Sequence, residues 1–122
     1  MPGVDRIAAE RQRQMEVEGW TPEHDALHVN GELAMAACCY AAPQKIRALV
    51  YVPQNCGCRS VGECSHIFPV KKWVDPWPWD PNWDKREKHS PLRCLEIAGA
   101  LIAAEIDRLE RLENELPEVK RG

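Results

Sequence analysis

The longest regular pattern of apolar residues lies in the last third of the chain. Beyond residue 90, apolar side chains recur every three or four positions, which is the period of one face of an α-helix. Ser90 and Pro91 form a typical helix start, because serine caps the first turn and proline suits its first position. The pattern predicts a helix from residue 91 to about 115, ended by Pro117 and about 37 Å long at ~1.5 Å per residue. Its apolar stripe comprises Leu95, Ala98, Ile102, Ile106, Leu109, Leu112 and Leu116.

This predicted helix is longer than the core that a 122-residue chain builds around it. A domain of this size buries a modest core, so we expect the far end of the stripe to pack against another chain. Arg108, Glu110, Arg111 and Glu113 flank the stripe, as charged residues flank the seam of a coiled coil. The pattern therefore predicts a homo-oligomer that associates through helices.

The first 42 residues predict shorter helices. A thin apolar pattern over residues 6–18 indicates a solvated helix with one weak contact stripe. The Thr-Pro-Glu sequence that begins at Thr21 predicts a second helix start, and this segment continues to about residue 28. We expect Asn30 to cap a third helix over residues 31–42, which is apolar on nearly every side and therefore buried in the core or between subunits.

Residues 43–90 have a different character, because six prolines exclude a long regular helix. The apolar runs 49–52 and 67–74 predict two short strands. Residues 77–83, with three tryptophans and two prolines, predict a stiff extended segment that we call the Trp-Pro loop. The fold class that follows is mainly α, with a long C-terminal helix and an irregular, short-hairpin insertion rich in Pro, Trp and Cys. We predict a single domain, 1–122, made of N-terminal helices (1–42), the insertion (43–90) and the long helix (91–116).

Composition and charge narrow the class of protein. With 44% hydrophobic and 29% charged residues, the chain has an ordinary globular composition. The net charge of −3 argues against a general nucleic-acid coat, so we expect no long nucleic acid as a partner. No apolar run approaches the roughly 18 residues of a membrane span, and the first residues lack a secretory signal pattern. We therefore expect no membrane partner, a cytoplasmic location and reduced cysteines.

The most specific chemical signal is a cysteine cluster, Cys56-x-Cys58-x5-Cys64-x-His66. Three thiols and one imidazole match the ligand set of a tetrahedral structural zinc, and four protein ligands would leave no open position for catalysis. A zinc knuckle usually has two residues between paired cysteines, whereas this cluster has one, so a loop of free thiols is the alternative. We expect the other cysteines, Cys38, Cys39 and Cys94, to be packing residues on apolar helices.

A second signal is the cluster Glu23-His24-Asp25-x-x-His28-x-x-x-Glu32. On a helix, His24 and His28 share one face, and the two acids lie near a neighbouring face. Such a set is able to hold a divalent ion or to serve acid–base chemistry. Capping and solvated turns are the alternative, because acids near a helix start are common for dipole reasons alone.

A third signal is the concentration of four of the five tryptophans, with five cations and a histidine, between residues 71 and 89. Flat aromatic faces stack on nucleobases and cations pair with phosphate, so the segment suits a nucleotide-type ligand. The alternative is a small structural core for an irregular loop. The predicted ligand-binding residues are Trp77, Trp79 and Trp83 for the base, and Arg86, Lys88 and His89 for phosphate, with Arg108 from a neighbouring subunit.

Several motifs stand near the two ends of the chain: ERQRQ at 10–14, EGWTPEHD at 18–25, GELA at 31–34 and AGALIAAEIDRL at 98–109, together with WPW at 77–79. With these motifs the chain resembles a family of small uncharacterised proteins encoded by phages and prophages. The resemblance covers about half of the chain, and the cysteine cluster looks like an insertion relative to it. The family brings no established activity, so it assigns no functional residues.

The resemblance implies a context of host defence. Small accessory phage proteins often sequester a nucleotide signal, so our first hypothesis is a counter-defence sponge for such a ligand in the host cytoplasm. The second is an inhibitor that docks on a host defence protein. The third is a MazG-like, metal-dependent nucleotide pyrophosphohydrolase using Glu32, Glu105 and Asp107, although the expected E-x-x-E pair is missing. The absence of a phosphate-binding loop and of a nucleophile elbow makes an enzyme the weaker expectation.

Overall fold

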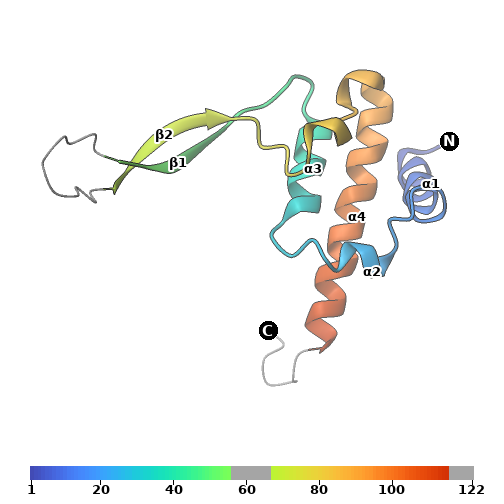
Figure 1. The fold of residues 1–122 in the computed structure, drawn as a ribbon. Coiled ribbons are helices and arrows are strands. Elements are labelled where there is room, and N and C mark those ends of the chain that lie inside the picture. Colours follow the sequence, from blue (N-terminus) through green and yellow to red (C-terminus); the bar gives the residue numbers. More distant parts are fainter. Residues whose placement is uncertain (56–66, 116–122) are drawn as a thin grey trace, which may run out of the picture. The chain divides into compact units, whose positions relative to one another are not determined.

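The computed structural model describes residues 1–55 and 67–115 and confirms the mainly α fold (Figure 1). The long C-terminal helix and the short hairpin are both present. The elements are the helices α1 (Gly3–Glu16), α2 (Pro22–Asp25), α3 (Glu32–Ala41) and α4 (Pro91–Glu115), the strands β1 (Ala48–Asn55) and β2 (Ile67–Val74), and the single 3-10 turns η1 (Pro81–Trp83) and η2 (Arg86–Lys88).

The chain divides into two compact units. The helical unit contains residues 1–44 and 77–122, and the hairpin unit contains residues 45–76. The Trp-Pro loop, which the sequence groups with the insertion, therefore belongs to the helical unit. In the hairpin unit, β1 and β2 pair in antiparallel fashion, with Leu49 opposite Trp73 and Tyr51 opposite Lys71.

Helix α4 is the centre of the helical unit, and α1, α2 and α3 all contact it. In Figure 1, α3 and α1 lie on different sides of α4. Small side chains dominate the interface between α3 and α4, which lets these two helices approach closely. The core consists of Leu33, Ala36, Ala37 and Tyr40 from α3 and Cys94, Ile97, Ala98, Leu101 and Ala104 from α4.

The face of α4 that enters the core differs from the predicted stripe. Of the stripe, Ala98 is buried, Leu116 lies outside the described residues, and the others are about half exposed. The reason is steric, because the alanine-rich face permits closer helix packing than the leucine and isoleucine face does. The exposed stripe residues are Leu95, Ile102, Ile106, Leu109 and Leu112, at 53%, 48%, 57%, 49% and 50% exposure.

Of the capping residues predicted at Ser90, Thr21 and Asn30, the first two are confirmed and the third is wrong. The Ser90 and Thr21 side chains each accept a backbone N–H three residues later, at 3.2 and 3.3 Å. Asn30 is not the cap of α3: Gly31 occupies that position with a φ of 78°, and no side chain caps it. Instead, the Glu32 carboxylate reaches back and accepts the Asn30 N–H at 2.5 Å.

Helix α1 is less solvated than its thin apolar pattern predicts, because it buries polar side chains. Glu10 and Gln14 are 2% and 0% exposed. The Glu10 carboxylate accepts hydrogen bonds from Arg13 at 2.6 Å and from Arg93 of α4 at 2.6 Å. An ion network thus contributes to the contact between α1 and α4. The helix also begins earlier than predicted, at Gly3.

Candidate functional site

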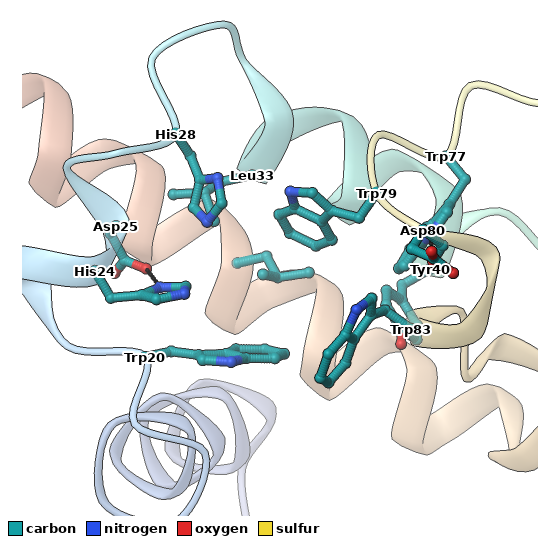
Figure 2. Close-up of a pocket in the computed structure, with 11 residues that line it drawn as sticks. Trp20, His24, Asp25, His28, Leu33, Tyr40, Trp77, Trp79, Asp80 and Trp83 are labelled. Carbon is teal, nitrogen blue, oxygen red and sulfur yellow. Dashed lines mark hydrogen bonds and ion pairs between the residues drawn. The ribbon is translucent and has the colours of Figure 1, made fainter.

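A pocket with a volume of about 330 Å³ opens in the helical unit (Figure 2). Its lining combines residues from α2, α3, α4, the turn before α2 and the Trp-Pro loop. Five aromatic side chains form most of the walls: Trp20, Tyr40, Trp77, Trp79 and Trp83. The polar lining residues are His24, Asp25, His28 and Asp80, and the aliphatic ones are Leu33 and Leu101.

The rings of the pocket contact one another in series. Tyr40 meets Trp77 at a centroid distance of 5.7 Å, and Trp77 meets Trp79 at 5.5 Å, both edge to face. Trp79 meets His28 at 5.2 Å, and His28 meets His24 at 5.0 Å. Edge-to-face contacts of this kind add to the stability gained by burial. The series therefore holds the pocket walls in place without a ligand.

Trp83 differs from the other tryptophans of the pocket. Trp20, Trp77 and Trp79 are partly buried and pack against the core, whereas Trp83 is 67% exposed. Turn η1 holds it, because the Asp80 carboxylate accepts the Asn82 N–H at 2.8 Å and caps that turn. Figure 2 shows the Trp83 ring at the side of the pocket opposite the histidines.

A buried ion pair lies beside the first histidine. The Asp25 side chain is 2% exposed and accepts a hydrogen bond from Arg11 at 2.8 Å. The same arginine donates to the Trp20 carbonyl at 3.2 Å, which ties the turn before α2 to α1. The other Asp25 oxygen lies 3.6 Å from Nδ1 of His24. The Nε2 edge of this imidazole is therefore turned away from the carboxylate, toward the pocket (Figure 2).

A second carboxylate supports the other histidine. Nδ1 of His28 lies 3.2 Å from Glu32, four residues later in the chain. Burial raises the pKa of the Glu32 carboxyl, but hydrogen bonds from the Asn30 N–H and from His28 outweigh it and hold this pKa below its ordinary value. An ionised Glu32 therefore helps to orient the His28 ring, which lines the pocket.

The predicted ligand-binding residues fall into two groups. Trp77, Trp79 and Trp83 line the pocket, whereas the four predicted phosphate contacts do not. Arg86 donates to Asp84 at 2.8 Å and lies 5.4 Å from the Trp77 ring centre, and Arg108 forms an ion pair with Glu105. Lys88 and His89 are exposed on and after η2.

Sequence reasoning missed the other half of the pocket. It treated the His24–His28 cluster and the Trp-Pro loop as two separate signals, although the fold brings them together. Trp20 and Tyr40 carried no chemical signal of their own. The one hint was that Trp20 lies immediately before the Thr21 cap, next to the histidine cluster.

Other predicted chemical groups lie elsewhere. Cys56, Cys58, Cys64 and His66 fall outside the described residues. Within residues 1–55 and 67–115, no group of three or more His, Cys, Asp or Glu side chains is placed to hold a metal ion. The acids of the pyrophosphohydrolase hypothesis are divided: Glu32 contacts His28, Glu105 pairs with Arg108, and Asp107 is exposed. Cys38 is exposed rather than a packing residue, whereas Cys39 and Cys94 are buried.

Comparisons with known proteins give no family for this chain. No protein-family model matches it, and neither a curated protein nor a solved structure matches it. Within residues 1–55 and 67–115, no helix has both the length and the apolar character needed to cross a membrane. The pocket itself is therefore the basis on which a function is assigned.

Proposed function

We propose that this chain binds and sequesters a nucleotide-type small molecule in the aromatic pocket of its helical unit. The observation that supports this most is the gathering of four of the five tryptophans around one cavity. A volume of about 330 Å³ lies within the range of small-molecule sites. Stacking on an aromatic face is worth about 1–3 kcal/mol per base and tolerates any base.

The exposure of Trp83 supports binding over a purely structural role. A structural tryptophan gains stability by burying its ring, but Trp83 leaves 67% of its surface in contact with solvent. A planar ligand in the pocket would cover the inner face of this ring and so bury apolar surface that solvent now contacts. Trp83 is thus the side chain whose loss should reduce binding with the least effect on folding.

The histidines are the groups proposed to contact the polar part of the ligand. Their Nδ1 edges face Asp25 and Glu32, so each Nε2 edge is available to the pocket. This replaces the expectation that Arg86, Lys88 and His89 contact phosphate within one chain, since these residues do not line the pocket. Arg108 of a neighbouring subunit stays a prediction, because it requires an oligomer.

Association through α4 is part of the proposal. Leu95, Ile102 and Ile106 leave about half of their surfaces exposed on one side of this helix. A row of exposed large apolar residues marks an interaction surface more often than a solvated one. A second copy of α4, flanked by the same alternating charges, is the partner that the sequence pattern predicts.

The biological role proposed for this binding is counter-defence, with the protein acting as a sponge for a nucleotide signal in the host cell. Its support is the resemblance of the motifs at 10–14, 18–25, 31–34 and 98–109 to phage-encoded proteins. A pocket built mainly from rings suits capture and retention of a planar ligand.

Native mass spectrometry tests the proposal. Protein purified from bacteria without chelator, then mixed with nucleosides, mononucleotides and cyclic dinucleotides, should retain at least one of them at one molecule per pocket. The same spectrum gives the subunit number and shows whether one zinc per chain is present, as proposed for Cys56, Cys58, Cys64 and His66. Release of pyrophosphate from nucleoside triphosphates with magnesium would favour the enzyme hypothesis instead.

A further inference from the structure

The hairpin unit has two different faces. Because side chains alternate along a strand, the paired residues Leu49 and Trp73 share one face with the paired residues Tyr51 and Lys71. The other face carries four valines of intermediate exposure, Val50, Val52, Val70 and Val74, together with the exposed Lys72 opposite Val50. We call the face that carries Leu49, Tyr51, Lys71 and Trp73 the aromatic face. None of these residues lines the pocket of the helical unit.

The aromatic face is exposed to solvent. Tyr51 and Trp73 are 63% and 64% exposed, and Leu49 between their strands is 42% exposed. Lys71 lies over the Tyr51 ring at 5.9 Å from its centre, a cation–π contact that keeps the ring and the charge side by side. Two flat rings and one cation thus occupy a single surface.

Charge sets this unit apart from the whole chain. The chain carries a net charge of −3, but residues 45–55 and 67–76 contain Lys45, Arg47, Lys71 and Lys72 against the single acid Asp75. Lys45 lies 3.7 Å from Asp75. Within the described residues, no ion pair involves the other three cations. The hairpin therefore presents a local positive charge to solvent.

We propose that the aromatic face of the hairpin binds a short segment of single-stranded nucleic acid. Exposed rings stack on unpaired bases, and neighbouring cations contact the phosphates between them. Tyr51 and Trp73 are diagonal neighbours across the two strands, and diagonal positions lie roughly 7–8 Å apart. That spacing accommodates two bases that are splayed rather than stacked on each other. The site is distinct from the nucleotide pocket and does not depend on it.

The test is fluorescence anisotropy with the full chain and a labelled oligothymidylate of about 12 nucleotides, which is within the usual site size of single-strand binders. The unmodified protein should bind it at low salt. Tyr51→Ala combined with Trp73→Ala should weaken binding at least tenfold, whereas Tyr51→Phe, which keeps the ring, should retain most of it. Lys71→Gln should reduce the salt dependence of oligothymidylate binding, since fewer counterions are released.

Matched controls separate binding at this face from binding elsewhere on the chain. Trp83→Ala, in the helical unit, should leave oligothymidylate binding unchanged. A duplex of the same length should bind more weakly, because its bases cannot reach the rings. Absence of binding at low salt, equal binding by the double alanine variant, or equal affinity for duplex and single strand would each overturn the proposal. None of these outcomes bears on whether the pocket of the helical unit binds nucleotides.

Discussion

Glu10 is a buried side chain that links the two longest helices, alongside the Arg6–Glu96 ion pair at 3.4 Å. It is 2% exposed and accepts hydrogen bonds from Arg13 of its own helix and Arg93 of α4. Its neighbour Gln14 donates to it at 3.1 Å. No hydrophobic pattern predicts such a contact, because a glutamate in a charged segment looks solvated until the partner helix is known. The sequence alone therefore does not predict this ion network.

Replacing Glu10 with glutamine should destabilise the protein by about 2–4 kcal/mol. Breaking a buried ion pair costs about 3–5 kcal/mol, and the partial exposure of Arg13 and Arg93, at 37% and 30%, lowers that figure here. Glu18→Gln is the matched control, because Glu18 pairs with the same Arg13 but is 42% exposed; it should cost less than about 1 kcal/mol. Urea denaturation measures both, and equal losses would argue against the network.

The same carboxylate should make stability fall in acid. Burial raises the pKa of Glu10, but the hydrogen bonds and charges of Arg13 and Arg93 outweigh it and hold the pKa below its ordinary value of 4.5. A depressed folded-state pKa contributes stability that is present above pH 4.5 and is lost as pH falls through the folded-state value. As the pH is lowered below 4.5, the urea midpoint of the unmodified protein should thus fall steeply. The midpoint of Glu10→Gln should fall less steeply, because glutamine has no carboxyl group to protonate.

The contact between α1 and α4 depends on a glycine in the middle of a helix. A methyl group added at Gly99 would lie 2.6 Å from both Cδ1 and Cγ1 of Ile7. Glycine normally weakens a helix by about 1 kcal/mol relative to alanine, so its presence here serves close packing. The structure thus accounts for a residue that helix propensity alone disfavours.

Gly99→Ala should therefore reduce stability by about 1–2 kcal/mol, since overpacking outweighs the gain in helix propensity. Adding Ile7→Ala should relieve the contact and recover part of the loss. Gly3→Ala, where no atom lies within 4 Å, should be nearly neutral. Thermal or urea unfolding measures the stability of the three variants. A Gly99→Ala protein that is more stable than the unmodified protein would contradict this prediction, because Ile7 would then have moved to make room for the methyl group.

The bounds of α4 and of β2 were predicted from the sequence, whereas β1 extends beyond the predicted residues 49–52 and the buried face of α4 was not predicted. Periodicity identifies a helix and its ends, whereas the choice of face depends on what packs against it. Here the alanine face enters the core and the leucine face stays exposed. The pocket shows the same limit. Trp77, Trp79 and Trp83 were predicted as ligand-binding residues, but their proximity to His24 and His28 depends on the packing of α2, α3 and the Trp-Pro loop.

For the molecule as a whole, the exposed face of α4 predicts self-association. Ile102→Glu with Ile106→Glu places charges on two residues that are 48% and 57% exposed, so folding should survive. Light scattering after gel filtration should show an oligomer for the unmodified protein and a monomer for this variant. Asp107→Lys, on the same helix, is the control that changes charge without touching the apolar stripe. If the unmodified protein is a monomer even at high concentration, the proposed association through α4 is wrong.

The nucleotide proposal is tested most sharply by a calorimetric titration of the unmodified protein, Trp83→Ala and Trp73→Ala with the nucleotide panel. Both tryptophans are more than half exposed, at 67% and 64%, but only Trp83 lines the pocket. Saturable binding by the unmodified protein and by Trp73→Ala, weakened at least tenfold in a folded Trp83→Ala variant, is the predicted result. No binding of any nucleotide, or equal binding by all three proteins, would mean that the aromatic pocket is not a nucleotide site.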